Sequence, residues 1–275
     1  MVKSQDEFNI IRTIRQALEL SLLRQRKIKI IIKKEMKLTY IYHSGYAIEG
    51  DDFTIIIDYF KDSSENKNDG IVHKELLKKK GKLYILCTHS HHDHFNKEIL
   101  KWKWEHPNVI YIFSKDILKY KKAKERDAIY LDKSDTYKDE TLHIKAYGST
   151  DLGVSFLINT ENKTIFHAGD LNNWHWNEES TKEEINEAES FYQNELTLLS
   201  NEVKHIDLAM FPIDPRLGKD YMKGAEQFIS SIKTDILAPM HFGEEYAKAA
   251  AFKDYADSKN CKFVSWKERG ESISF

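Results

Sequence analysis

The sequence has little of three things that would place it in a specialised class: cysteine, long apolar runs and an excess of one charge. It contains only two cysteines, Cys87 and Cys261, so we expect no disulfide framework and a reducing, cytoplasmic environment. No stretch approaches the roughly 18 consecutive apolar residues of a transmembrane helix. The N-terminus lacks the apolar segment and cleavage site of a secretory signal. A net charge of −2 provides no overall field that would attract nucleic acid or a membrane.

The first 35 residues differ in pattern from the rest. Isoleucine and leucine recur at helical spacing among arginines and lysines over about residues 4–34, which predicts a basic amphipathic helix. We favour packing on the main domain or local disorder for this helix over binding to a membrane. We therefore divide the chain into an N-terminal helical extension, residues 1–35, and a domain of residues 36–275 whose first strand begins near Met36.

Beyond Met36, β-type and helical patterns are interleaved. Segments rich in Ile, Val, Tyr, Phe and Thr predict strands at residues 37–48, 54–58, 82–87, 109–113, 141–147, 154–159, 164–168, 208–212, 236–240 and 262–265. Helical periodicity predicts helices at residues 72–80, 97–102, 180–200, 222–232 and 245–257. Two runs of strands with helices between them predict two sheets packed face to face and covered by helices.

The strongest chemical signal is a histidine cluster directly after the predicted strand at residues 82–87. Four of the 12 histidines fall within the segment Thr88-His89-Ser90-His91-His92-Asp93-His94. A structural histidine is usually solitary, so this density predicts a metal site. Because residues two apart in an extended segment point the same way, His89 and His91 can bind one metal. Asp93 and His94 follow a turn of the chain and can face a second position.

More ligands must come from other strands, because one loop cannot surround a metal ion. Asp170 follows an apolar strand and Gly169, which permits a sharp turn, so that its carboxylate can bridge two cations. His241 stands where another apolar strand ends. His92 is expected to point away from the metals. Imidazole and carboxylate ligands suit zinc, one or two ions, with manganese or iron as alternatives.

These motifs, in this order, resemble the metallo-β-lactamase superfamily: His-x-His-x-Asp-His after one strand, Gly-Asp after a second and His after a third. The segment 42–49, followed by residues 55–58, resembles the opening hairpin of lactonase-like members of the ascorbate-6-phosphate lactonase type. The resemblance covers roughly Met36 to the C-terminus and implies an α/β fold, the four-layer αββα sandwich. It also implies that a metal-activated water is the nucleophile, with Asp93 accepting its proton. The implied metal ligands are His89, His91, Asp93, His94, Asp170 and His241.

One ligand of the family pattern is missing. The family usually supplies a further histidine to the first metal from the loop before the Gly-Asp strand, and residues 146–153 contain no histidine. Asp151, Ser149 or a water are candidate replacements, and His143 is a less favoured one. The second position is unaffected, so both a mononuclear and a dinuclear centre remain open.

The same resemblance leaves the substrate open, because the family acts on many chemical classes. We favour a zinc hydrolase acting on a small ester, lactone or phosphoester. A nuclease or RNA-processing enzyme would need a basic exosite or a further domain, and neither is evident. A non-catalytic, metal-stabilised binding protein is the third alternative. Candidate substrate-binding residues are His43, His175 and Arg216. The expected partner is a small molecule rather than nucleic acid, and the oligomeric state is left open.

Overall fold

The computed structural model describes residues 14–16, 18–19 and 35–275. The chain divides into two compact units, Met1–Glu35 and Met36–Phe275. Residues 14–16 and 18–19 of the first unit are helical, and the rest of the helix predicted over residues 4–34 lies outside the described residues. Among the described residues, no helix has both the length and the apolar character needed to cross a membrane.

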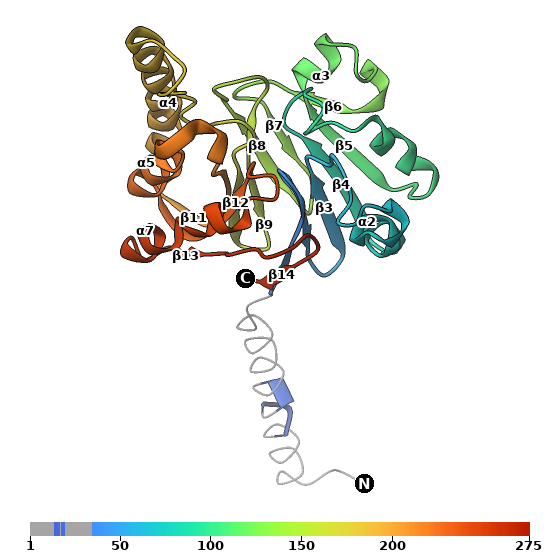
Figure 1. The fold of residues 1–275 in the computed structure, drawn as a ribbon. Helices are drawn as coiled ribbons and strands as arrows, with labels where there is room; N and C mark the ends of the chain where they lie inside the picture. Colours follow the sequence, from blue (N-terminus) through green and yellow to red (C-terminus); the bar gives the residue numbers. More distant parts are fainter. Residues whose placement is uncertain (1–13, 17, 20–34) are drawn as a thin grey trace, which may run out of the picture. The chain divides into compact units, whose positions relative to one another are not determined.

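The second unit contains two seven-stranded sheets, which lie face to face in its centre (Figure 1). The first sheet has the order β14-β1-β2-β3-β4-β5-β6 and comprises β1 (Lys37–Tyr42), β2 (Gly45–Glu49), β3 (Phe53–Ile57), β4 (Lys82–Cys87), β5 (Val109–Ser114), β6 (Ile129–Leu131) and β14 (Ser272–Ser274). The second sheet has the order β13-β12-β11-β10-β9-β8-β7 and comprises β7 (Thr136–Lys138), β8 (His143–Tyr147), β9 (Ser155–Thr160), β10 (Lys163–His167), β11 (His205–Pro212), β12 (Lys233–Met240) and β13 (Lys262–Phe263).

Helices cover the outer face of each sheet, which confirms the αββα sandwich (Figure 1). The helical segments between the strands of the first sheet are η1 (Lys67–Asp69), α2 (Ile71–Lys74), η2 (Leu76–Lys78), η3 (Lys97–Trp104), α3 (Lys115–Lys119) and η4 (Glu125–Asp127). Those accompanying the second sheet are α4 (Lys182–Glu202), η5 (Pro215–Asp220), α5 (Lys223–Ser231), α6 (Tyr246–Ala250) and α7 (Lys253–Ser258).

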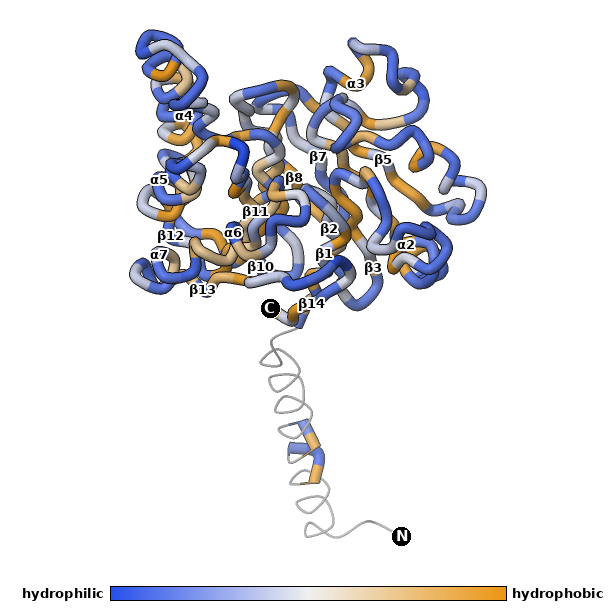
Figure 2. Tube along the Cα trace, in the orientation of Figure 1, coloured by the Kyte–Doolittle hydropathy of each residue, from blue (hydrophilic) through white to orange (hydrophobic). Residues whose placement is uncertain are grey.

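Strand β4 illustrates how the sequence forms two cores. Successive side chains of a strand point to opposite faces. Tyr84 and Leu86 therefore enter the core between the sheets, whereas Leu83, Ile85 and Cys87 pack beneath the outer helices. Because both faces of the sheet are covered, its parallel strands are apolar throughout rather than alternating. The hydrophobic residues accordingly follow the strands in the middle of the domain, with polar residues on the outer helices and loops (Figure 2).

Helix α4 forms close to the predicted residues 180–200. The Thr181 side chain accepts a hydrogen bond from the amide of Glu184, whose carboxylate accepts one from the amide of Thr181. This capping box pairs two backbone donors that the first turn of a helix leaves free. Tyr192, Leu196 and Leu199 are buried at helical spacing, so one face of the helix packs on the second sheet while the rest meets solvent.

The structure differs from the sequence prediction at several elements. The strand predicted over residues 37–48 is a hairpin that turns at His43 and Ser44. The helix predicted over residues 245–257 is two short helices. Strands β6, β7 and β14 were not predicted. Each has three residues and most of them are not buried, so no apolar pattern marks these edge strands.

The two sheets are joined at the end where parallel strands finish. Strands β3 and β4 run parallel in the first sheet, as do β10, β11 and β12 in the second. The hairpin turn of the first sheet meets the second sheet here: Nε2 of His167 lies 2.9 Å from the carbonyl oxygen of Ser44. The amide of His241 donates to the carbonyl of His43 at 3.1 Å. Loops from both sheets therefore meet at the carboxyl ends of these strands, where ligand sites of α/β proteins form.

Candidate metal centre

The loop after β4 is held by its own backbone and by a buried thiol. The amides of His94 and Phe95 both donate to the carbonyl of His91, at 3.2 and 2.9 Å, which closes a tight turn. The thiol of Cys87 donates to the carbonyls of His89 and His94, at 3.3 and 3.1 Å. These contacts hold the backbone of the loop that carries the histidine cluster found in the sequence.

A first group of donors consists of His89, His91, Asp151 and Asp170. One donor atom from each lies within 4.8 Å of all the others. Nε2 of His89 is 3.1 Å from Nδ1 of His91 and 3.3 Å from Oδ2 of Asp170. Nδ1 of His91 is 3.4 Å from Oδ2 of Asp151. Of the two residues favoured as replacements for the missing histidine, Asp151 joins this group, whereas Ser149 accepts a hydrogen bond from the amide of Asp151.

A second group consists of His43, Asp93, His94 and His241, whose donor atoms also lie within 4.8 Å of one another. Oδ2 of Asp93 is 3.4 Å from Nε2 of His43 and 3.9 Å from Nε2 of His241. The rings of His43 and His241 are 4.2 Å apart between centroids. The sequence prediction had treated His43 as a substrate-binding residue rather than as a member of this group.

Asp170 faces both groups. Its Oδ2 lies toward His89, whereas its Oδ1 is 3.2 Å from Nε2 of His94 and 3.5 Å from Nε2 of His241. The residue is only 4% exposed, so the carboxylate is enclosed between the histidines of the two groups. This arrangement matches what a carboxylate that bridges two cations requires.

Four residues at strand ends around the centre have left-handed backbone conformations. The φ angles are 56° at His43, 49° at Asp58, 65° at His241 and 54° at Gly169. Positive φ is uncommon for residues other than glycine and tends to occur at functional sites. A side chain at Gly169 would place its Cβ 2.9 Å from Cβ of Thr88, so this turn requires glycine for space as well as for conformation.

Two buried aspartates orient the histidines from behind. Asp58 accepts hydrogen bonds from the amide of Thr88, the hydroxyl of Thr88 and Nδ1 of His94, at 2.8, 2.7 and 2.8 Å. Asp214 accepts one from Nδ1 of His241 at 2.9 Å. With Nδ1 donating, each histidine presents Nε2 as its free electron-pair donor, which is the usual arrangement of metal-binding histidines. The sequence prediction missed both aspartates.

The donor set fits divalent metal ions. Several buried side-chain atoms that face the centre have no hydrogen-bond partner: Nε2 of His43, His94 and His241, and Oδ1 of Asp170. An unpaired buried polar group costs about 1–3 kcal/mol, and a bound cation would remove that cost. Two ligands bound to one ion at about 2.0–2.2 Å, about 90–120° apart, are separated by about 2.8–3.8 Å. The nearest donor separations within the groups, and those from Asp170 to the second group, are 3.1–3.5 Å and lie in this range. The 3.9 Å separation of His241 and Asp93 lies just beyond it.

Asp93, Asp170 and His43 are in the protonation states that metal binding requires. Burial alone would raise the pKa of the Asp170 carboxyl, but the neighbouring His94 and His241 hold it well below its usual range. In the same way, His43 and His94 outweigh burial and depress the pKa of Asp93. Burial is the main cause that lowers the pKa of His43 to about 4. The carboxylates are therefore ionised and His43 is neutral at neutral pH, the forms that bind metals. At His94, the carboxylates of Asp170 and Asp58 outweigh burial and raise the pKa well above its usual range, so metal binding there displaces a proton.

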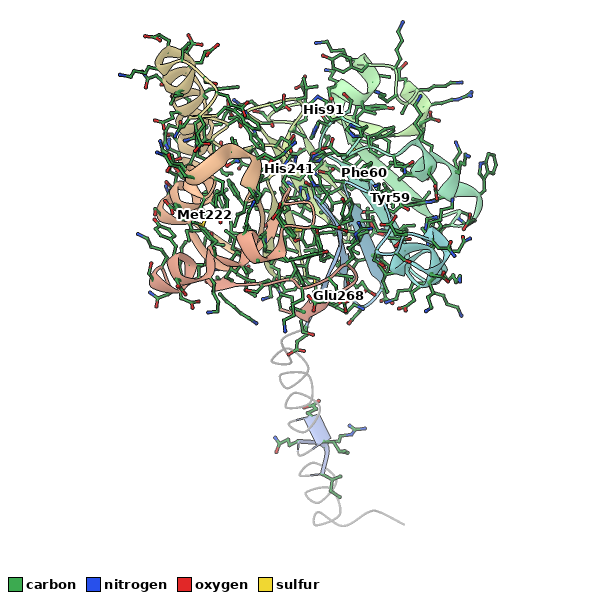
Figure 3. The ribbon with its side chains drawn as sticks, in the orientation of Figure 1. Tyr59, Phe60, His91, Met222, His241 and Glu268 are labelled. Atoms are coloured by element: carbon green, nitrogen blue, oxygen red, sulfur yellow. The ribbon has the colours of Figure 1, made fainter. Side chains whose placement is uncertain are left out.

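Two pockets open on the centre. The first, of about 360 Å³, is walled by Trp174 and Trp176 and reaches His91 of the first group. The second, of about 510 Å³, is walled by aromatic residues that include Tyr42 and Phe60. Both pockets are lined by Asp93, Arg216 and His241. Figure 3 shows His91, His241 and Phe60 on the loops at this end of the sandwich.

The predicted substrate-binding residues do not all reach these pockets. Arg216 lines both, and its guanidinium is held by the carboxylate of Asp214. His175 is 1% exposed, and its Nε2 lies 3.1 Å from the carbonyl oxygen of Asp220, so its side chain is turned away from the pockets. His143 is exposed on β8 and belongs to neither donor group.

Comparison with known proteins agrees with the fold. No curated protein matches the sequence. The solved structure of Igni18, a metallo hydrolase from Ignicoccus hospitalis, is similar with a TM-score of 0.63 and 19% identity over 88% of this chain and 98% of its own. YhfI of Bacillus subtilis, a metallo-β-lactamase fold protein, has a TM-score of 0.57 and 14% identity, over 88% of this chain and 100% of its own. CmlA of Streptomyces venezuelae, a diiron β-hydroxylase, has a TM-score of 0.59 and 14% identity, over 88% of this chain but only 54% of its own.

These identities establish the fold alone. The family is shown by residues 37–189, more than half of the chain, which match the β-lactamase superfamily domain. That range contains the histidine cluster, Asp151 and Asp170. The chain therefore belongs to the β-lactamase superfamily and has the metallo-β-lactamase fold.

Proposed function

We propose that the protein is a metal-dependent hydrolase with two adjacent metal positions. His89, His91, Asp151 and Asp170 would hold the first ion, and Asp93, His94 and His241 would hold the second with Asp170 between them. Zinc is the metal that we expect. When bound, such ions lower the pKa of water to near neutrality and polarise the substrate's reacting oxygen.

The observation that carries the proposal is the position of Asp170. Its two oxygens face different groups of histidines at 3.2–3.5 Å, and the buried Nε2 atoms of His94 and His241 have no hydrogen-bond partner. A single structural ion would not need donors on both sides of one carboxylate. Two ions held about 3.5–4 Å apart are the usual arrangement of hydrolases that stabilise an attacking and a leaving oxygen together.

Asp93 and Arg216 would act on the water and the substrate. Asp93 is ionised and lines both pockets, so its carboxylate can orient a water in the cleft and accept its proton. Arg216 lies between the pockets, which suits an anionic or strongly polar group of a small ester, lactone or phosphoester. The stacked rings of Trp174 and Trp176, 6.4 Å apart, offer a flat apolar wall for the rest of the substrate.

The test compares the Asp93→Ala variant with the unmodified chain, both loaded with zinc or manganese. The substrates are 4-nitrophenyl acetate, a simple lactone and bis(4-nitrophenyl) phosphate. We expect the unmodified chain to hydrolyse at least one substrate. In the variant the rate of this hydrolysis should fall by a factor of at least about 10², while the circular dichroism spectrum stays unchanged. An Asp254→Ala variant, altered at an exposed position of α7, is the matched control.

Wild-type turnover by Asp93→Ala would refute the assigned role of this carboxylate. Absence of bound metal in the purified chain after incubation with excess zinc would refute the hydrolase proposal as a whole. For the substrate, Arg216→Gln should lower kcat/KM for the anionic diester by about tenfold. The neutral ester is the internal control, because equal losses on both would mean that Arg216 acts only through Asp214 and His241.

A further inference from the structure

We infer that His43 is a fifth protein ligand of the second metal position, which makes that position closed and leaves the first as the open one. The inference rests on the proposed metal centre. It adds a ligand from the hairpin formed by β1 and β2, and it assigns a different role to each of the two ions.

The backbone of His43 is tied to the centre on both sides. Its amide donates to the hydroxyl of Tyr40 at 3.0 Å, and its carbonyl accepts the amide of His241 at 3.1 Å. The φ angle of 56° places the residue at the apex of the turn between β1 and β2. A strained turn that is bonded to the strand end carrying another donor holds the imidazole in place.

The side chain of His43 has the features of a ligand. Its Nε2 is buried and has no hydrogen-bond partner, yet it lies 3.4 Å from Oδ2 of Asp93. This separation is within the range expected for two ligands of one ion, about 2.8–3.8 Å. His43 lines the second pocket, but its Nε2 is buried among the donors of the second group. A proton donor or a substrate-binding group would need this atom exposed to the pocket.

The two positions then differ in how completely the protein surrounds them. The second position faces five protein donors: His43, Asp93, His94, His241 and Asp170. The first faces four, and the side chains of His91 and Asp151 are 44% and 45% exposed. Structural metal sites are closed by protein ligands, whereas catalytic sites keep a position open for water or substrate. The second ion is therefore the tightly held, anchoring one, and the first ion is the exchangeable one that meets the substrate.

The experiment measures zinc binding by the full chain in competition with a chromophoric chelator. The unmodified protein should bind two equivalents, one tighter than the other. In His43→Ala the affinity for the tight equivalent should fall at least about tenfold, while the weaker one is unchanged, and added imidazole should restore the loss. A His205→Ala variant at an exposed position is the matched control.

Cobalt substitution supplies a second readout that does not depend on activity. Loss of one ligand from a five-coordinate ion should strengthen the visible absorption of the tight equivalent in His43→Ala. His43→Asn, which keeps a polar side chain in the turn, serves if the alanine variant does not fold. Wild-type affinities and spectrum in the variant, or loss of the weaker equivalent instead, would overturn the assignment of His43. Absence of zinc binding by the unmodified chain would overturn the metal centre itself.

Discussion

The carboxylate of Asp58 accepts a hydrogen bond from Nδ1 of His94 at 2.8 Å, and both side chains are fully buried. The same carboxylate accepts hydrogen bonds from the amide and the hydroxyl of Thr88. The hydroxyl oxygen of Thr88 in turn lies 3.1 Å from Nδ1 of His89. One aspartate at the end of β3 thus orients a histidine of each donor group. The negative charge behind the imidazoles also makes their Nε2 atoms stronger donors.

An Asp58→Asn variant tests this support. Asparagine keeps the size of the side chain but removes its charge and one acceptor oxygen, so His94 loses its orienting partner. We expect metal affinity to fall about 10–100-fold, with the fold retained. Competition with a chelator measures the metal affinity, and circular dichroism shows whether the variant is folded. Unchanged affinity in a folded variant would mean that the loop positions His94 without Asp58.

Asp151 provides a second test, because it lies where the family usually has a histidine. Asp151→Ala should lose one equivalent of metal, the more weakly bound one, since it removes a donor from the exposed side of the first group. Asp151→His should retain two equivalents. Elemental analysis after gel filtration gives the stoichiometry. Two equivalents in Asp151→Ala would show that a water or another group completes this position.

A third prediction concerns pH and lies away from the metal centre. Nδ1 of His73 is 2.7 Å from Asp62, and Nε2 is 2.6 Å from Glu98. The hydrogen bond to Asp62 is the main cause that raises the pKa of His73. Burial alone would raise the pKa of Glu98, but Lys67 and His73 outweigh it and lower that pKa.

The signs define a pH window for this cluster. Protonated His73 stabilises the fold fully below its unfolded pKa of about 6.5, and this contribution disappears as pH rises through the raised folded pKa. The contribution of Glu98 is present above its unfolded pKa and disappears as pH falls through the lowered one. His73→Gln should therefore lower Tm more at pH 5.5 than at pH 9. The corresponding difference in the free energy of unfolding should be about 1 kcal/mol or less, because Glu98 is partly exposed. Equal losses of Tm at both pH values would contradict a charged His73.

The fourth prediction concerns the division of the chain. Residues Met36–Phe275 form a compact unit with its own core between two sheets. We expect a chain that begins at Met36 to fold with the metal content of the full chain. Gel filtration and metal analysis of the shortened protein check this. Aggregation of the shortened chain would show that the first 35 residues are an integral part of the fold.

Much of the centre was predictable because it is encoded locally. His89, His91, Asp93 and His94 lie on one loop, and strand periodicity predicted β4 before them and the apolar strands before Asp170 and His241. Long buried strands and the capped helix α4 were also predictable, since burial leaves a pattern in neighbouring residues. The short edge strands were not, because their residues are mostly exposed and carry no such pattern.

What the sequence by itself determined, then, is the fold class, the order of its main strands and the loops that carry most of the donors. The tertiary structure alone decided how the remaining residues combine. His43 joins the second donor group because the hairpin turn of the first sheet meets the end of β12. Asp58 and Asp214 support histidines, and His175 faces away, because of how loops pack across two sheets. Such contacts join residues far apart in the chain, and their physical cause is the burial of the two sheets against each other rather than any local pattern.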